Sequence, residues 1–83
     1  MAAILRIVEK MLRIPSEMRF DEVVRVLEYL GWEHKRTKGS HFAYYKKGRC
    51  IIVVKHKNRI KRAYIKRIVV ELNLEEWYER NKK

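Results

Sequence analysis

This chain of 83 residues is short of several residue types: it has one cysteine, one proline, three glycines and no glutamine. The single cysteine, Cys50, excludes a disulfide framework within the chain, and its apolar neighbours predict a buried thiol. No apolar run approaches the roughly 20 residues that cross a bilayer, and charged residues interrupt the apolar start of the chain. We therefore expect a protein of the cytoplasm without a secretory signal or a membrane partner.

Acidic residues are also missing from the middle of the chain. None lies between His34 and Val70, whereas this segment holds 13 of the 21 Lys and Arg, and the formal net charge is +11. Such an excess predicts a polyanionic partner, above all nucleic acid, and one strongly positive face. A solvated surface is the alternative, but repulsion within so long an acid-free segment destabilises the compact state.

Apolar residues recur with a helical period in residues 3–14, 16–31 and 60–72. Pro15 ends the first of these helices, and Asn73 can cap the last. Residues 74–83 predict a further turn or short helix, with Trp77 packing back onto the fold. The residues expected to face the core are Ile4, Leu5, Val8, Met11 and Leu12, then Phe20, Val23, Val24, Leu27 and Leu30, then Ile65, Ile68, Val69 and Leu72.

Between these helices the sequence predicts three strands. The alternation in residues 32–37 places Trp32, His34 and Arg36 on one side. Residues 41–47 are rich in aromatics and lead to a hairpin turn at Gly48. Residues 49–56 are β-branched and apolar on both faces, which predicts a well-buried strand.

The predicted fold is α+β, with the order α-β-β-β-α: a three-stranded antiparallel sheet with helices packed on one face, plus an extra N-terminal amphipathic helix. We expect residues 1–15 to form a helical extension and residues 16–83 to form a single domain. The apolar stripe of this extension could cover the free face of the sheet or pair with a second copy of the chain. We favour a homodimer contact.

The segment from Lys38 to His41 is the candidate site. Gly39 permits a tight bend, the Ser40 hydroxyl can bind backbone or phosphate, and His41 begins a strand, where it is anchored yet reachable. Lys38, Lys46 and the basic residues of 55–62 are expected to surround His41 with positive charge. The alternative is a partly buried strand histidine that bonds to the backbone. Of the other histidines, we expect His34 to have a structural role and His56 to contact phosphate.

The residue types limit the chemistry that this segment can perform. A two-metal nuclease needs several carboxylates, and a zinc site needs closely placed Cys and His ligands, so we expect neither a metal nor another cofactor. No nucleophile, base and orienting group stand together for covalent catalysis. A metal-free nuclease would act on RNA, whose 2′-hydroxyl is the nucleophile, with a histidine moving the proton and cations stabilising the phosphorane.

The segment from Ile14 to Val54 resembles the HicA (YcfA-like) family of mRNA interferase toxins. The shared features are Glu22-Val23-Val24, the step from Leu27 to Trp32, and Gly39-Ser40-His41; residues 72–77 also resemble the family's helix end. The resemblance implies a fold like that of double-stranded-RNA-binding domains and a metal-independent endoribonuclease in which His41 is catalytic. It also implies a HicB-type antitoxin that masks the site.

The resemblance gives a role to the basic residues around the start of the last helix, because such domains contact phosphates there. The residues expected to bind RNA are Lys38, Gly39, Ser40, Lys46, Lys57, Arg59, Lys61, Arg62 and Lys66. The chain departs from the family pattern at Phe42, where a second histidine is common, at Ala63-Tyr64, where Gly-Thr is common, and by lacking a proline near the end of the third strand.

These departures keep a second hypothesis open, a non-catalytic RNA-binding module that keeps the basic face and lacks turnover. A DNA-binding regulator is a third, weaker option, because the sequence shows no helix-turn-helix spacing.

Overall fold

The computed structural model describes residues 1–82. The predicted order of three helices around three strands is confirmed, and residues 74–81 form the expected short helix. Two short strands are added. The elements in chain order are α1 (Ala2–Leu12), β1 (Glu17–Arg19), α2 (Phe20–Tyr29), β2 (Glu33–Lys38), β3 (His41–Lys46), β4 (Arg49–Val54), β5 (Arg59–Lys61), α3 (Arg62–Glu71) and α4 (Leu74–Asn81).

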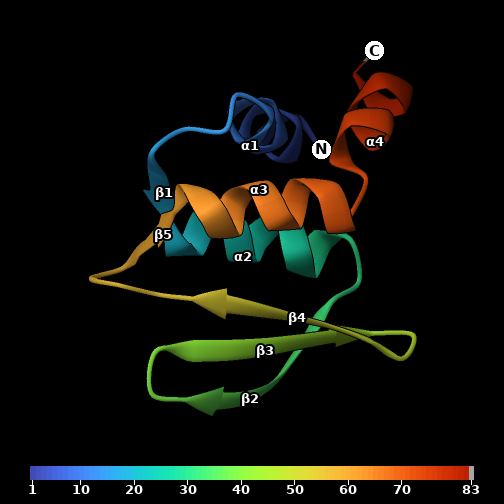
Figure 1. Cartoon of the computed structure of the whole chain (residues 1–83). Coiled ribbons are helices and arrows are strands. Elements are labelled where there is room, and N and C mark those ends of the chain that lie inside the picture. Colours follow the sequence, from blue (N-terminus) through green and yellow to red (C-terminus); the bar gives the residue numbers. More distant parts are fainter. Residues whose placement is uncertain (83) are drawn as a thin grey trace.

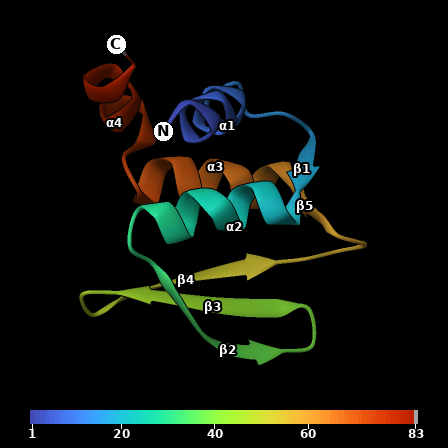
Figure 2. The same ribbon diagram turned by 180° about the vertical axis from the view of Figure 1, so that it is seen from behind.

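The helices form two layers above the three long strands. Figures 1 and 2 show α2 and α3 side by side, between the sheet and the pair formed by α1 and α4. The core runs through these layers, with Val23 and Leu27 of α2 and Ile65 and Ile68 of α3 all at most 1% exposed. This confirms the helical periods read from the sequence. Asn73 takes the left-handed conformation that ends α3, as predicted (φ 50°).

The three-stranded sheet is antiparallel with the order β2-β3-β4, so β3 is the central strand. The β3–β4 hairpin turns at Lys47 and Gly48, which both have positive φ (48° and 78°). Two successive positive φ angles are the mark of the type I′ turn, whose twist matches that of the flanking strands. The turn predicted at Gly48 is therefore confirmed.

The strand β4 is less buried than its sequence suggests. Ile51 and Val53 are covered, but Ile52 is 37% exposed and the Cys50 thiol is also exposed. The predictions of a well-buried strand and a buried thiol are wrong, because helices cover one face of the sheet and β4 lies at its edge. The apolar residues on the other face of β4 meet solvent.

The strands β1 and β5 form a second, two-stranded sheet that the sequence did not predict. Met18 lies opposite Ile60, and both side chains are buried (1% and 0% exposed). Each strand runs directly into a helix, β1 into α2 and β5 into α3. The ladder therefore fixes the starting points of the two central helices next to each other.

The helix α1 belongs to the same core as the rest of the chain. Ile4, Ile7, Val8 and Met11 are at most 8% exposed and pack with residues of α2, α3 and α4. The apolar stripe is thus covered by the chain itself and is not free for the predicted dimer contact. The division at residue 15 stays a prediction. No helix within residues 1–82 has the length and hydrophobicity needed to cross a bilayer.

Candidate nucleic-acid interface

A register shift in β2 decides which side chains share a face of the sheet. His34 pairs with Tyr44, but Arg36 pairs with Ala43, the next residue back along β3. His34 therefore lies on the helix side, with its ring 5.4 Å from that of Tyr44, and Arg36 lies on the opposite side. The prediction that Trp32, His34 and Arg36 point the same way is wrong, because it assumed unbroken alternation.

His41 lies on the face that the helices leave uncovered. Its neighbour Phe42 points to the helix side, where its ring packs 4.8 Å from that of Phe20, so alternation along β3 turns His41 outward. His41 pairs with Lys38 of β2 and with Val54 of β4, and its side chain is exposed. The alternative of a partly buried histidine is therefore wrong.

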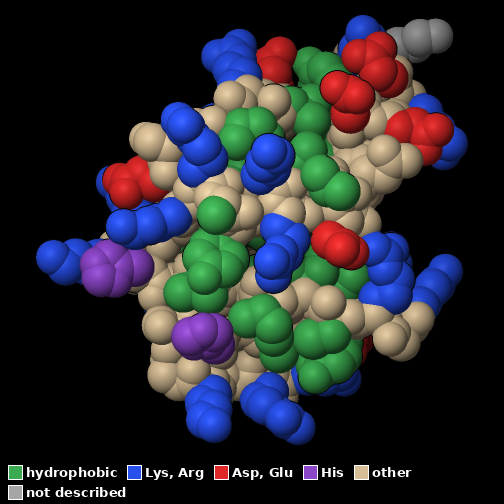
Figure 3. Space-filling model, viewed as in Figure 1, with side chains coloured by type: hydrophobic (Ala, Val, Ile, Leu, Met, Phe, Trp, Pro, Cys, Tyr) green, Lys and Arg blue, Asp and Glu red, His purple; other side chains and the backbone are tan. Residues whose placement is uncertain are grey.

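Five side chains define this surface, which we call the histidine face: Arg36, Lys38, His41, Tyr45 and Ile52. In Figure 3, which has the view of Figure 1, hydrophobic side chains gather over the sheet, with a histidine and several Lys or Arg side chains around them. Within residues 1–82, no carboxylate forms an ion pair with Arg36 or Lys38. Their charge is free to meet an anion.

Tyr45 marks the far side of the histidine face. Tyr45 lies opposite Cys50 of β4, and hydrogen bonding to the Cys50 side chain raises the pKa of Tyr45. Arg36 lies near enough to act in the opposite direction. Tyr45 is thus a neutral phenol at ordinary pH, with Arg36 beside it.

A second group of cations lies at the His41 end of the molecule. The β2–β3 turn, the β4–β5 connection and the start of α3 share this end in Figures 1 and 2. The Lys55 amide donates to the Ser40 carbonyl (2.9 Å), which fastens the connection to the turn. Gly39, with φ 60°, has open space around it. Of the residues predicted to bind RNA, this end holds Lys38, Gly39, Ser40, Lys57, Arg59, Lys61 and Arg62, and Lys66 lies one helical turn beyond.

The start of α3 is electrostatically unusual. No acidic residue lies in its first turn, although the positive end of the helix dipole favours acids there. Instead Lys61 and Arg62 occupy the first positions, with Lys66 one turn later. Arg59 has a carboxylate near it, Glu17 at 3.9 Å. A phosphate group would relieve the concentration of positive charge at this helix end.

Lys46 does not join the site that the sequence assigned to it. It ends β3, roughly 16 Å from His41 at about 3.3 Å per residue. Its ammonium donates to the carbonyl of Leu30 at the end of α2. The expectation that Lys46 surrounds His41 is therefore wrong, because the two side chains point to opposite faces at opposite ends of one strand.

Two residues near the site, Arg36 and Tyr45, were missed in the sequence. Assigning Arg36 to the site requires knowledge of the register shift in β2. Assigning Tyr45 to the site requires knowledge that helices do not cover its face of the sheet. The Lys55 ammonium lies 4.7 Å and 4.9 Å from the ring centroids of Phe20 and Phe42, on the helix side. Lys55 was expected among the cations around His41, and that expectation is wrong for its ammonium, because the two rings lie on the face of the sheet opposite to His41.

The geometry supports proton transfer and phosphate binding. An exposed imidazole stands opposite an ammonium on a strand pair, with a free guanidinium on the same face. Within the described residues, His, Cys, Asp and Glu form no group of three that could hold a metal ion. The residues present thus supply a proton carrier and cations, the parts that a phosphodiester reaction with an internal nucleophile needs.

Together these features define a small basic α+β domain with a histidine on an open sheet face. The sequence model of one family, described as the HicA toxin of bacterial toxin–antitoxin, matches residues 20–74. This match covers more than half of the chain, and the chain therefore belongs to the HicA toxin family. Comparison with curated proteins and with solved structures gives no match. Membership makes this chain a toxin-type protein and implies an antitoxin partner.

Proposed function

We propose that this chain is an endoribonuclease toxin that cleaves mRNA in the cytoplasm without a metal, and that His41 is its catalytic residue. The observation that carries the proposal is the position of His41: exposed, at the start of the central strand, opposite Lys38 and on the same face as Arg36. The family match supports the same conclusion from the sequence.

The proposed reaction uses the 2′-hydroxyl of RNA as the nucleophile. The 2′-oxygen attacks the adjacent phosphorus, its proton leaves, and the bond from phosphorus to the 5′-oxygen breaks as that oxygen gains a proton. His41 carries one of these protons, a role that typically contributes a factor of about 10²–10⁴ in rate, and water carries the other. Lys38 and Arg36 stabilise the negative charge that grows on the phosphorane oxygens.

The proposed path of the RNA joins the histidine face to the start of α3. Phosphates on one side of the cut would meet Arg36 and Lys38, and those on the other side would meet Lys57, Lys61 and Arg62 at the same end of the molecule. A HicB-type antitoxin would prevent cleavage by covering His41.

The second candidate function is RNA binding without turnover. It is favoured by the basic start of α3, which can bind phosphate whether or not His41 acts. The two candidates differ in one respect that can be measured, which is the requirement for the imidazole.

The test is cleavage of single-stranded RNA in EDTA by the purified chain and by His41→Ala. His56→Ala is the matched control, because His56 is an exposed histidine at the same end. We expect His41→Ala to lose cleavage and keep its RNA affinity. His56→Ala should keep cleaving saturating RNA, and loss of the expected phosphate contact at His56 should appear only as weaker RNA affinity. Cleavage that needs Mg²⁺, or that His41→Ala retains, rules out the proposed mechanism. Binding without cleavage by the unmodified chain supports the second candidate.

A further inference from the structure

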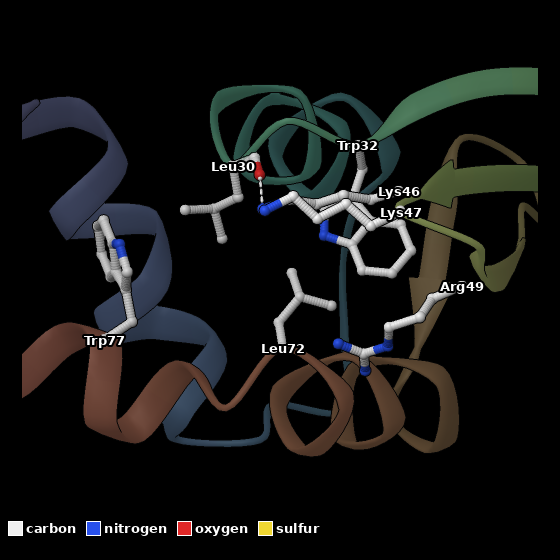
Figure 4. A pocket seen from close by; sticks show the side chains of 7 residues that line it. All are labelled: Leu30, Trp32, Lys46, Lys47, Arg49, Leu72 and Trp77. Carbon is white, nitrogen blue, oxygen red and sulfur yellow. Dashed lines mark hydrogen bonds between the residues drawn. The ribbon is translucent and has the colours of Figure 1, made fainter.

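The far end of the sheet from His41 contains a second concave site. A cavity of about 290 Å³ lies between the β3–β4 hairpin and the ends of α2 and α3, with α4 on its other side. We call it the distal groove. Figure 4 shows the seven side chains that line it, which are Leu30, Trp32, Lys46, Lys47, Arg49, Leu72 and Trp77.

The inner wall of the distal groove is apolar. Leu30, Leu72 and Trp77 are partly buried, and Trp32 is 4% exposed and closes the bottom. In Figure 4 the side chains of Leu30, Leu72 and Trp77 border one open space. The Trp77 ring meets Tyr29 edge to face, with centroids 6.4 Å apart, which fixes its orientation. The wall is therefore preformed for one bulky apolar side chain.

The rim of the distal groove is cationic. Lys46 donates to the Leu30 carbonyl, and Arg49 donates to the carbonyl and the carboxylate of Glu71. Each keeps unused donors, because an ammonium has three and a guanidinium has five. Lys47, in the hairpin turn, is exposed and has no carboxylate partner within residues 1–82. Among the described residues, Glu71 is the one carboxylate that forms an ion pair with these three cations, which favours a negatively charged occupant.

We propose that the distal groove binds an acidic segment of a partner protein, which inserts one bulky apolar side chain between Leu30, Leu72 and Trp77 and places its carboxylates on Lys47 and Arg49. An apolar anchor in a pocket with charges around it is the usual centre of a protein interface. The wall suits a side chain better than a nucleobase, because Trp32 is buried and the Trp77 ring meets Tyr29 edge to face, so Leu30 and Leu72 supply much of the apolar surface and little ring surface is free for stacking.

The partner expected to carry this segment is the antitoxin that family membership implies. A chain of net charge +11 favours an acidic partner. The distal groove and His41 lie at opposite ends of β3, so the segment would hold the toxin without touching the histidine face. The inference therefore extends the proposed function and does not depend on RNA cleavage.

The test uses the peptide acetyl-Asp-Glu-Phe-Glu-Asp-amide as a probe of the required chemistry. Its binding to the full chain is followed by the NMR signal of the Trp77 indole N–H. Two control peptides replace the phenylalanine by alanine or the four acids by lysine. We expect a saturable shift with the first peptide and none with either control.

Two charge-reversal variants test whether the peptide binds at the distal groove. Lys47 and Lys57 are both exposed lysines with positive φ (48° and 51°), one at each end of the sheet, and aspartate tolerates that backbone conformation. We expect Lys47→Asp to weaken peptide binding about fivefold or more, since one rim charge is reversed, and Lys57→Asp to leave it within twofold. For RNA affinity we expect the opposite order.

Three results would overturn the proposal. The first is equal binding of the phenylalanine and alanine peptides, which would show that the apolar pocket does not contribute to binding. The second is equal weakening of peptide binding by Lys47→Asp and Lys57→Asp, which would show that net charge, and not the distal groove, determines binding. The third is a shift of the Trp77 signal by an RNA oligonucleotide with none by the peptide, which assigns the groove to nucleic acid. Because the readout is binding at Trp77, an inactive nuclease would leave the test intact.

Discussion

Phe20 and Phe42 pack with their ring centroids 4.8 Å apart, which joins the first residue of α2 to the second residue of β3. The Lys55 ammonium lies over both rings. This contact holds residue 42 on the helix side of the sheet, and because side chains alternate along a strand it also holds His41 outward. The outward direction of His41 is therefore set by aromatic packing beneath it.

We predict that Phe42→His will not create a second catalytic histidine, although many family members have one there. Position 42 points away from the histidine face, so the cleavage rate of the folded protein should not rise. Stability should fall by about 1–3 kcal/mol, because an imidazole replaces a packed ring beside the Lys55 cation. Urea denaturation and RNA cleavage measure the two effects.

Tyr45→His is the comparison for that variant, because it places an imidazole on the uncovered face of the same strand. We expect Tyr45→His to lose less stability than Phe42→His. A faster cleavage rate in Phe42→His would show that position 42 reaches the RNA and that the two faces are wrongly assigned.

The second prediction concerns the cations of the histidine face. We expect Arg36→Ala and Lys38→Ala each to lower kcat for RNA cleavage by about tenfold, because each removes charge stabilisation that grows in the transition state. Single-turnover cleavage in EDTA gives the rates. Lys35→Ala is the control, since its ammonium is held by Glu33 at 2.9 Å and it should change the rate little. Equal losses in all three variants would indicate a general charge effect.

The third prediction concerns the start of α3. Replacing Lys61, Arg62 and Lys66 by alanine should weaken binding of single-stranded RNA and reduce the slope of log affinity against log salt by about 2. The reason is that each lost phosphate contact removes roughly 0.7 from the slope. Affinity titrations at a series of salt concentrations measure it, with His41→Ala as the background so that the RNA stays intact.

The matched control removes the same charge from another part of the surface. Arg6, Arg13 and Arg80 are exposed cations in or next to α1 and α4, so their alanine triple should keep the original slope. A slope reduced to the same extent would mean that net charge, and not the start of α3, determines RNA binding.

The fourth prediction concerns pH and the docking of α4 on α1. The Tyr78 hydroxyl donates to the Glu9 carboxylate at 3.0 Å, and this hydrogen bond, with some desolvation, raises the pKa of Tyr78. Folding therefore favours the protonated phenol. This contribution is fully present below the ordinary tyrosine pKa of about 10 and is lost as the pH rises through the higher pKa of the folded state.

Urea midpoints at several pH values between about 8 and 11 give the measurement for this fourth prediction. Tyr78→Phe is the reference, because it removes the titrating group and keeps the ring. The stability difference between the unmodified chain and Tyr78→Phe should shrink as the pH rises. A difference that stays constant across this range would show that the hydrogen bond does not contribute in solution.

Periodicity and turn chemistry were sufficient to predict the main elements of the fold. The helices α2 and α3 repeat apolar residues at helical spacing over whole turns, and Gly48 follows an aromatic strand. The strands β1 and β5 have three residues each, too few for an alternation to stand out from the helices that follow them. Their pairing depends on contacts distant in sequence, which no local pattern contains.

The candidate site was predicted only in part, because local sequence patterns identify some of its residues and long-range contacts place the others. His41 and Lys38 are close in sequence and flank one turn, so their proximity follows from the hairpin alone. Arg36 joins them through a register shift, which no turn residue in the sequence marks. Lys46 lies at the other end of β3 on the opposite face, where it bonds to the Leu30 carbonyl. The exposure of Cys50 required knowing that helices cover only one side of the sheet.

The β1–β5 ladder has a consequence for the order of assembly. Its outermost pair, Glu17 with Lys61, closes a loop of chain that contains α2 and the whole three-stranded sheet. Contacts of such long range cost the most chain entropy, so local hairpins generally form before them. We expect the antiparallel strands β2, β3 and β4 to form first and α1 to pack onto the other helices last. The docking of the amino-terminal helix would then be the step that completes folding.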